Sequence, residues 1–173
     1  DRQVNILFKN FRFQAFDAVF SIITNFGVVV LFMLAIPSIV LYKKNNRNVY
    51  LLLTTFIVSV VIAFIIKLIV LRQRPTEIFA HTNVGIINYP FFSILYYSFP
   101  SMHAMAAFSL LPALIKFLPK QKNLWIGFAF LVGFTRIYFG FHFLSDVVFG
   151  ALFGYFIGIF LLEYYKKGRL WLK

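Results

Sequence analysis

The sequence predicts an all-α protein, a polytopic bundle of transmembrane helices, and three observations lead to this fold class. Hydrophobic residues make up 61% of the 173 residues and charged residues only 13%, against about 25% charged in ordinary soluble domains. The mean hydropathy is +0.85. The apolar residues form continuous runs long enough for membrane helices, rather than the alternating pattern of membrane β-strands. Composition therefore excludes a water-soluble enzyme, a disordered tail and a β-barrel.

The N-terminal segment, residues 4–16, is expected to form an amphipathic helix that lies in the membrane interface. Apolar residues recur along it at helical spacing, but Lys9, Arg12 and other polar residues interrupt it, so it is too short and too charged to span. Five apolar runs follow, and each predicts one transmembrane helix: residues 18–42, 49–71, 102–118, 124–138 and 143–165. Residues 1–173 are expected to form a single domain.

One long connection, residues 72–100, joins the second and third apolar runs. Long connections in compact proteins are usually functional or disordered. This one carries aromatic residues suited to the headgroup region, which predicts that it packs at the membrane interface. These aromatic residues are Phe79, Tyr89, Phe91, Phe92, Tyr96 and Tyr97.

The distribution of charge predicts how the bundle is oriented. Lys and Arg total 17 against 5 acidic residues, giving a net charge of +12. The basic residues lie between apolar runs, so they indicate membrane anchors and anion ligands rather than a nucleic-acid partner. Alternating spans place ten of them on one side, which the positive-inside rule makes cytoplasmic. These ten are Lys43, Lys44, Arg47, Lys116, Lys120, Lys122, Lys166, Lys167, Arg169 and Lys173.

Lys67 and Arg74 form the first candidate group, on the opposite, outer side. Lys67 lies near the end of an apolar run, where a lysine is costly and is therefore a functional candidate. Arg74 follows seven residues later, which places it on the same helical face if the helix continues to Pro75. The alternative for Lys67 is a side chain that snorkels to the headgroups.

Ser101, Met102 and His103 form the second group, at the start of the third run. Ser101 can N-cap this helix, whose first amide groups form an anion site with the helix dipole. His103 lies where an acid could serve the same anion. Taken alone, an ordinary capped helix start with an interfacial histidine is the simpler interpretation.

Arg136, His142 and Asp146 form the third group. His142 and Asp146 are four residues apart, which places them on one face of a helix, within reach of a hydrogen bond. A carboxylate behind an imidazole fixes its tautomer and stabilises its cation. Gly140 can turn the chain so that Arg136 returns beside His142. A purely structural His–Asp hydrogen bond is the alternative.

Together the three groups read Lys-x6-Arg-Pro, Pro-Ser-x-His and Arg-x5-His-x3-Asp, and they resemble the three-part motif of the type 2 phosphatidic acid phosphatase family. That superfamily includes membrane lipid phosphatases and soluble vanadium haloperoxidases. Two positions differ: Met102 stands where the family usually has Gly, and Thr135 where it has Ser. Many members have six spans, so either a first span is missing at the N-terminus or this is a short form with an interfacial helix.

The resemblance implies a metal-independent lipid phosphatase with no cofactor, whose catalytic residues are His142, His103 and Asp146. His142 would attack phosphorus and become a phosphohistidine, with Asp146 holding its far nitrogen. His103 would protonate the leaving oxygen and then assist the attacking water. The resemblance assigns phosphate binding to Lys67, Arg74, Ser101, the Met102 amide and Arg136.

The family also implies a substrate class. The bacterial options are lipid A 1-phosphate, undecaprenyl pyrophosphate and phosphatidylglycerophosphate. The loop charges predict that the substrate is cleaved at the periplasmic face of the inner membrane. The basic N-terminal helix (Arg2, Lys9 and Arg12) favours the first two substrates, which carry more than one anionic group. The alternatives are a lipid phosphotransferase with the same site, or a transporter or scaffold that binds lipid phosphate without cleaving it. Membrane composition excludes a haloperoxidase, and the oligomeric state stays open.

Four further features match no motif position. Arg72, Glu77 and His81 are interpreted as loop or interface residues. Gly150, Gly154 and Gly158 form a ridge of small residues on the last span, which favours close packing within the bundle over a dimer seam.

The predicted orientation can be tested by cysteine labelling, because the chain contains no natural cysteine. With the basic connections in the cytoplasm, Asn46→Cys and Lys122→Cys should resist an impermeant thiol reagent in intact cells. Asn83→Cys, in the long outer connection, should react. Labelling at position 46 and protection at position 83 would invert the protein.

Overall fold

The computed structural model describes residues 1–10, 13–43, 45–75 and 97–168, and these residues are helical apart from short connections. The helices are α1 (Arg2–Asn10), α2 (Gln14–Ile23), α3 (Phe26–Val30), the π-helical turn η1 (Leu31–Ala35), α4 (Ile36–Tyr42), α5 (Asn46–Val70), α7 (Met102–Phe117), the 3₁₀ turn η3 (Pro119–Gln121), α8 (Lys122–Tyr138) and α9 (Leu144–Lys166). One isolated antiparallel bridge joins Gln73 to Tyr97. The predicted all-α class is confirmed.

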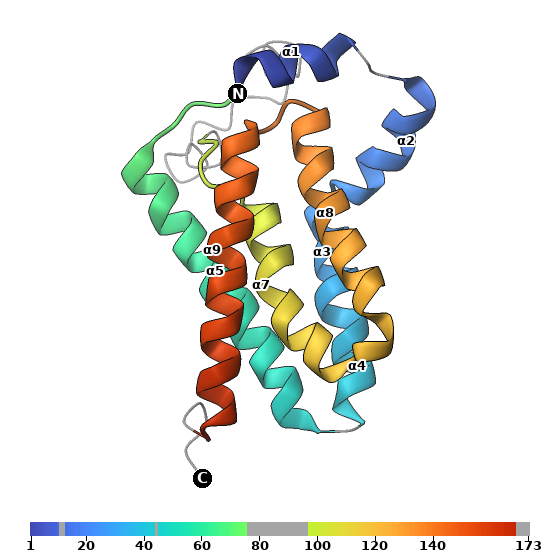
Figure 1. Cartoon of the computed structure of the whole chain (residues 1–173), viewed down its shortest axis with the longest axis vertical. Coiled ribbons are helices and arrows are strands. Elements are labelled where there is room, and N and C mark those ends of the chain that lie inside the picture. Colours follow the sequence, from blue (N-terminus) through green and yellow to red (C-terminus); the bar gives the residue numbers. More distant parts are fainter. Residues whose placement is uncertain (11–12, 44, 76–96, 169–173) are drawn as a thin grey trace.

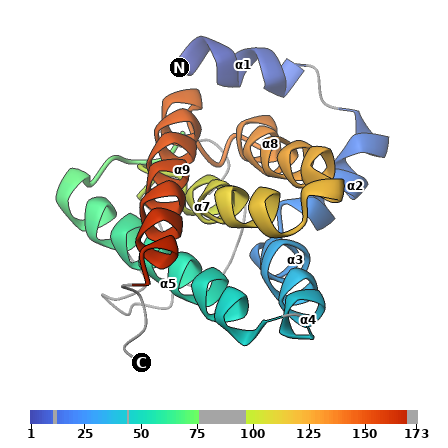
Figure 2. The same ribbon diagram turned by 60° about the horizontal axis from the view of Figure 1, so that its bottom comes forward.

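Helix α7 is the centre of the bundle. It packs against α9, α5 and α8, and both ribbon views show it between them (Figure 1, Figure 2). Its alanine, leucine and serine side chains are almost all buried, whereas α5 and α9 keep large exposed side chains such as Ile69 and Phe160 on their outer faces. A helix that is apolar all round therefore occupies the core, and its neighbours carry the surface that lipid would cover.

The first apolar run is not one continuous span, as the sequence predicted, because the chain breaks at Thr24 and Asn25. The helical segments on either side of the break meet at 61°. Asn25 starts α3 by accepting a hydrogen bond from the amide of Gly27 (2.8 Å), which caps the new helix. Before the break, α2 leans onto α8, where the ring of Phe20 packs edge-on against Tyr138 at 5.0 Å.

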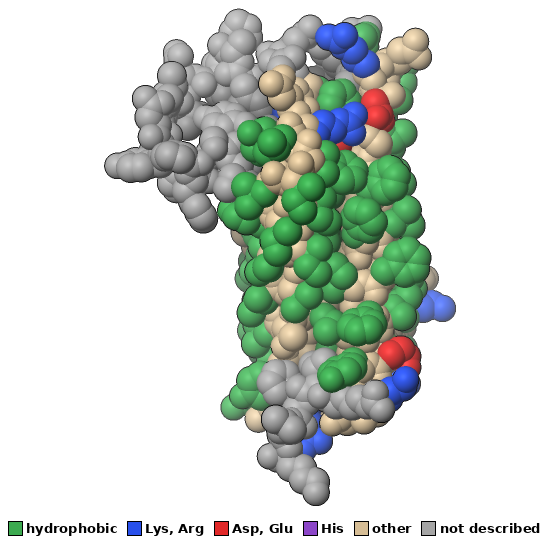
Figure 3. All heavy atoms as spheres, turned by 90° about the vertical axis from the view of Figure 1, so that its left-hand side faces the viewer, with side chains coloured by type: hydrophobic (Ala, Val, Ile, Leu, Met, Phe, Trp, Pro, Cys, Tyr) green, Lys and Arg blue, Asp and Glu red, His purple; other side chains and the backbone are tan. Residues whose placement is uncertain are grey.

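Helices α5 and α9 are each long and apolar enough to cross a membrane, and the bent N-terminal pair could form a third span. Helix α7 is apolar but has only 16 residues, fewer than the roughly 20 needed to span. The count of five spans therefore stays a prediction. On the face shown in Figure 3, hydrophobic side chains cover the middle, and charged side chains lie mainly toward the two ends. This is the surface of a membrane protein.

The two ends of the bundle differ in what they carry. The α4–α5 and α7–α8 connections and the end of α9 gather at one end (Figure 1), which brings the described basic residues Lys43, Arg47, Lys120 and Lys166 there. The α8–α9 turn and the residues flanking the long connection lie at the other end. The chain thus alternates as predicted, while the side that faces the cytoplasm stays a prediction.

Helix α1 lies across the end opposite the basic connections (Figure 1). Its inner side chains Val4 and Phe8 pack against a small cluster of α7, α8 and α9 residues, and the Phe8 ring meets Phe134 edge-on at 5.4 Å. Its outer side chains Ile6 and Leu7 are exposed. The predicted helix over residues 4–16 is in fact two helices, since α1 ends at Asn10 and Gln14 begins α2.

A ridge of glycines joins α9 to α7. A Cβ atom added at Gly150, Gly154 or Gly158 would lie closer than 3.0 Å to a backbone carbonyl oxygen of α7 or its N-cap. Only glycine allows this approach, because any side chain would strike the neighbouring backbone. The ridge therefore packs within the bundle, as the sequence favoured, rather than forming a dimer seam.

We expect Gly158→Ala to lower the free energy of unfolding by roughly 1–3 kcal/mol, the usual cost of overpacking. Gly127→Ala on α8 is the matched control: nothing lies within 4 Å of its added Cβ, and alanine favours a helix by up to about 1 kcal/mol. Unfolding in mixed micelles, titrated with a denaturing detergent, measures both. Equal stability of the two variants would contradict the close approach of α9 to α7.

Candidate functional site

The three sequence groups come together at the end of the bundle that α1 crosses. Lys67 lies in the last turn of α5, Ser101 at the start of α7, Arg136 in the last turn of α8, and His142 and Asp146 around the start of α9. All five residues are buried. Buried charges are rare and costly in an apolar bundle, so their concentration marks this end as the candidate site.

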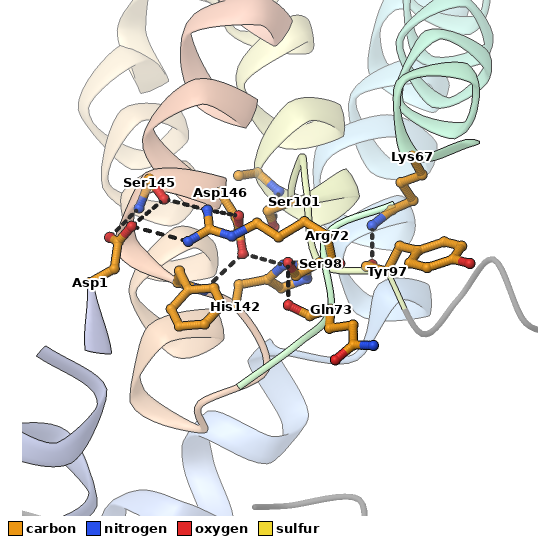
Figure 4. Close-up of polar contacts among 12 residues, drawn as sticks. Asp1, Lys67, Arg72, Gln73, Tyr97, Ser98, Ser101, His142, Ser145 and Asp146 are labelled. Atoms are coloured by element: carbon orange, nitrogen blue, oxygen red, sulfur yellow. Dashed lines mark hydrogen bonds and ion pairs between the residues drawn. The ribbon is translucent and has the colours of Figure 1, made fainter. Parts of the chain in front are cut away.

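Lys67 is held by a backbone carbonyl. Its Nζ donates a hydrogen bond to the carbonyl oxygen of Tyr97 at 2.6 Å (Figure 4). Tyr97 lies near the C-terminal end of the long connection. Lys67 is 2% exposed, which rules out the alternative of a side chain that snorkels to the headgroups. Its partner is neutral, so its charge stays available to an anion.

Arg74 does not lie on a continuation of α5, as the sequence predicted. The helix ends at Val70, and Leu71 adopts a left-handed conformation (φ 50°) that turns the chain away before Pro75 is reached. Arg74 lies in the segment that follows. Ser98 ties this segment to the start of α7: its amide donates to the Arg72 carbonyl at 2.7 Å and its hydroxyl to the Gln73 carbonyl at 3.1 Å.

Ser101 is the N-cap of α7, as predicted. Its hydroxyl accepts a hydrogen bond from the amide of Ala104 at 3.5 Å. Its own amide donates to the backbone carbonyl of Asp146 at 3.0 Å, which fixes the start of α7 beside the start of α9. The amides of Met102 and His103 belong to the first helical turn, so they have no partner within the helix and can bind an anion.

The turn between α8 and α9 brings Arg136 and His142 together, as predicted. Gly140 adopts a left-handed conformation (φ 67°), which few other residues tolerate. Beyond it, the amides of Phe141 and His142 both donate to the carbonyl of Arg136, at 3.0 and 3.2 Å. These bonds bring Arg136, at the start of the third motif, next to His142.

His142 and Asp146 do not share a helical face, because His142 precedes the first residue of α9. The Nδ1 atom of His142 lies 3.7 Å from Oδ2 of Asp146, which is longer than a hydrogen bond. The same oxygen accepts a hydrogen bond from the amide of Phe143 at 2.9 Å. The carboxylate is therefore oriented by the helix start and faces the imidazole without yet bonding to it.

Arg72, interpreted from the sequence as a loop residue, is the main partner of Asp146. Its Nη1 donates to Oδ1 of Asp146 at 2.8 Å and to the hydroxyl of Ser145 at 2.7 Å (Figure 4). Its Nη2 lies 3.2 Å from the carboxylate of Asp1, and its guanidinium stacks 4.2 Å from the ring centre of Phe143. Sequence reasoning missed this role because no motif marks Arg72. The one available signal was that a buried aspartate needs a cation.

The electrostatics of the site favour a neutral His142. Burial lowers the pKa of its imidazole well below the ordinary value, and the positive charges of Arg74, Arg136 and Lys67 lower that pKa further. Protonation would add a cation to a cluster that is already positive. His142 therefore keeps a free electron pair at neutral pH, as a nucleophile requires.

Other predicted features fall outside the described residues. These are Glu77, His81, Arg12 and the aromatic residues of the long connection up to Tyr96; Tyr97, the last of them, is half-buried in the bridge to Gln73. Within the described ranges, no group of three or more His, Cys, Asp or Glu side chains could hold a metal ion. Independence of metals stays a prediction.

Comparison with models of protein families shows which family this chain belongs to. Residues 48–169 match the family model of the PAP2 superfamily, and this range contains all three motifs. The chain belongs to the PAP2 superfamily. The matched range begins within α5 and excludes α1 to α4, so the family model covers the site-bearing helices and leaves the N-terminal segment unaccounted for.

Two curated relatives share parts of the chain. A lipid A 1-phosphatase from Rhizobium etli is 30% identical over 105 residues, which are 60% of this chain and 44% of the relative. The bacitracin transport permease protein BcrC from Bacillus licheniformis is 41% identical over 64 residues, 37% of this chain and 32% of the relative. The chain thus spans less than half the length of either relative.

Two solved PAP2-type structures share the fold over nearly the whole chain. Aquifex aeolicus LpxE superposes with a TM-score of 0.73 at 28% identity, covering 94% of each chain. A transmembrane PAP2-type phosphatidylglycerolphosphate phosphatase from Bacillus subtilis superposes with a TM-score of 0.72 at 22% identity, covering 99% of this chain and 87% of that one. The bundle described above is therefore the membrane form of the PAP2 fold.

We expect Arg72→Ala to destabilise the protein by roughly 1–3 kcal/mol, because it leaves the buried carboxylate of Asp146 without its cation. The double variant Arg72→Ala with Asp146→Asn should lose less than the sum of the two single losses. Arg2→Ala, exposed on α1, is the control and should change little. Unfolding in mixed micelles measures each variant, and additive losses would contradict the ion pair.

Proposed function

We propose that this PAP2 protein is a membrane enzyme that removes phosphate from a lipid headgroup through a phosphohistidine on His142. The observation that carries the proposal is a buried imidazole that faces Asp146, with a pKa lowered by burial and by the positive charges of Arg74, Arg136 and Lys67. An uncharged nucleophile within a cationic cluster matches the requirement of phosphoryl transfer, in which catalysis consists mainly of positioning and charge stabilisation.

The first half of the proposed reaction forms a phosphorus–nitrogen bond and breaks a phosphorus–oxygen bond. The Nδ1 atom of His142 faces Asp146, so we assign the attack on phosphorus to Nε2. Lys67, Arg74, Arg136 and the first amides of α7 neutralise the phosphoryl oxygens. His103 gives its proton to the leaving lipid oxygen, and the bound phosphate dianion favours the protonated form of His103 needed for this step.

The second half releases inorganic phosphate. Water attacks the phosphorus of the phosphohistidine, and His103 takes the proton of that water. The phosphorus–nitrogen bond breaks and returns its electron pair to Nε2 of His142, which regenerates both histidines. Asp146 stabilises the positive charge that the imidazole carries while it is phosphorylated.

For the substrate, we propose a phosphomonoester or pyrophosphate of an envelope lipid. The names of the relatives support this class, since they include a lipid A 1-phosphatase and a phosphatidylglycerolphosphate phosphatase. Turnover of purified lipid A 1-phosphate, undecaprenyl pyrophosphate and phosphatidylglycerophosphate, compared side by side, distinguishes the three candidates. The loop charges support a site at the periplasmic face of the inner membrane.

A second candidate is a protein that binds lipid phosphate without cleaving it, favoured by the relative named as a transport permease. A phosphotransferase is the third, since it would use the same residues. Formation of a covalent phosphoenzyme excludes the binding protein. Appearance of inorganic phosphate, rather than a newly phosphorylated lipid, excludes the transferase.

We expect replacement of His142 and replacement of His103 to block different steps of the reaction. His142→Ala should reduce turnover at least about 10⁴-fold, because no nucleophile remains. With an aryl phosphate, whose leaving group needs little protonation, His103→Ala should still phosphorylate His142 and then stall. The measurement is acid-labile, base-stable ³²P on the protein after a rapid quench.

His81→Ala is the matched control, since it removes a histidine that no motif contains, and it should retain activity. Label on His142→Ala equal to that on the wild type would place the nucleophile elsewhere. Turnover that survives in His142→Ala would reject the phosphohistidine mechanism altogether.

A further inference from the structure

Thr24, in the break between α2 and α3, contacts the candidate site although it lies outside the residues that match the family model. It precedes residues 48–169, and no motif contains it. Yet the Nη1 atom of Arg136 donates hydrogen bonds to both the hydroxyl of Thr24 (2.5 Å) and its backbone carbonyl (3.2 Å). One residue of the N-terminal segment thus supplies two acceptors to a buried cation of the third motif.

The break itself makes the Thr24 carbonyl available. In a continuous helix, this oxygen would accept a hydrogen bond from the amide of Val28. Instead, the amides of Val28 and Val29 both bond to the carbonyl of Asn25, at 3.0 and 3.2 Å. The 61° bend therefore releases one carbonyl from the helical ladder and presents it to Arg136.

The guanidinium of Arg136 is held on two sides. Thr24 binds its Nη1 end, and the ring of Phe141 covers its face at 4.5 Å. Arg136 is only 6% exposed. Its Nε atom is buried and has no hydrogen-bond partner in the described part of the chain. A buried donor without a partner is costly, so an unpaired Nε points to a ligand.

The same break also contacts His103. The ring of Phe26 meets the His103 imidazole edge-on at 4.9 Å, and the backbone of Thr24 lies beside the same imidazole. The residues 24–26 therefore touch both the proposed acid and a proposed phosphate ligand, which are otherwise carried by two different helices, α7 and α8.

We propose that Thr24 is a positioning residue of the phosphate site: it fixes Nη1 of Arg136 so that the edge formed by Nε and Nη2 is pre-oriented to bind two phosphoryl oxygens. Arginine binds oxyanions best through two parallel hydrogen bonds, and this geometry is lost if the side chain rotates. The inference deepens the proposed function, since it takes phosphate as the ligand. It makes the N-terminal segment part of the site.

The test measures vanadate affinity by calorimetry on the purified full chain, so it does not depend on turnover. Thr24→Val keeps the shape of the side chain and its carbonyl but removes the hydroxyl, and it should bind vanadate about tenfold more weakly, as expected for a lost bond to a charged group. Thr24→Ser should restore the affinity. Ser21→Ala removes an exposed hydroxyl one turn earlier on α2 and should have no effect.

Arg136→Ala measures how much vanadate affinity is lost when the whole guanidinium is removed. Vanadate affinity of Thr24→Val equal to the wild type, with Arg136→Ala impaired, would overturn the inference. Tighter binding would also overturn it, because Thr24 would then compete with the anion for Arg136. If Thr24→Val shows no melting transition, Thr24→Cys takes its place and should fall between valine and wild type.

The outcomes separate this inference from the proposed function. A wild-type protein that binds vanadate but hydrolyses no lipid phosphate would reject the enzyme and leave the role of Thr24 standing. A wild-type protein that binds no vanadate would overturn both.

Discussion

The close approach of α9 to α7 is the constraint on which the site depends. Gly150, Gly154 and Gly158 let the two backbones meet without side chains between them. At the end of this contact, the amide of Ser101 bonds to the carbonyl of Asp146. This bond places the N-terminus of α7 beside the turn that carries His142 and leads into α9. A wider separation would divide the cationic cluster into parts too distant to bind one phosphoryl group.

An apolar bundle offers few acceptors for buried cations, and the way this chain supplies them decides what the site can bind. Arg72 takes the carboxylate of Asp146, so that charge is balanced within the protein. Lys67 and Nη1 of Arg136 donate to backbone carbonyls, those of Tyr97 and Thr24, and Nη1 also donates to one hydroxyl. Neutral acceptors meet the need for hydrogen bonds but leave the positive charge uncompensated. The site therefore holds a surplus of positive charge that favours an anion.

Much of this could be predicted from the sequence, because both hydropathy and motif spacing are local. Continuous apolar runs predicted the helices from α5 onward almost to their ends, and the resemblance to the three family motifs predicted which residues would meet. The features that the sequence did not predict depend on tertiary contacts or on short polar interruptions of an apolar run. The partnership of Arg72 with Asp146 joins residues 74 positions apart, which no spacing rule reports. The break at Thr24 and Asn25 is two polar residues within a long apolar run, so averaging over that run conceals it.

The distance between His142 and Asp146 shows how such a site can favour the transition state over the resting enzyme. Asp146 is fixed by Arg72 and by the amide of Phe143, while its oxygen lies 3.7 Å from Nδ1 of the imidazole. A neutral imidazole gains little from closing that gap. In the proposed reaction, attack by Nε2 makes the ring cationic, and a shift of about 1 Å would then form a charge-assisted hydrogen bond. An interaction that strengthens only as charge develops lowers the barrier without tightening the binding of the substrate. The anchoring of Asp146 by Arg72 matters for this reason, because a carboxylate free to rotate would lose the orientation that the ring has to meet.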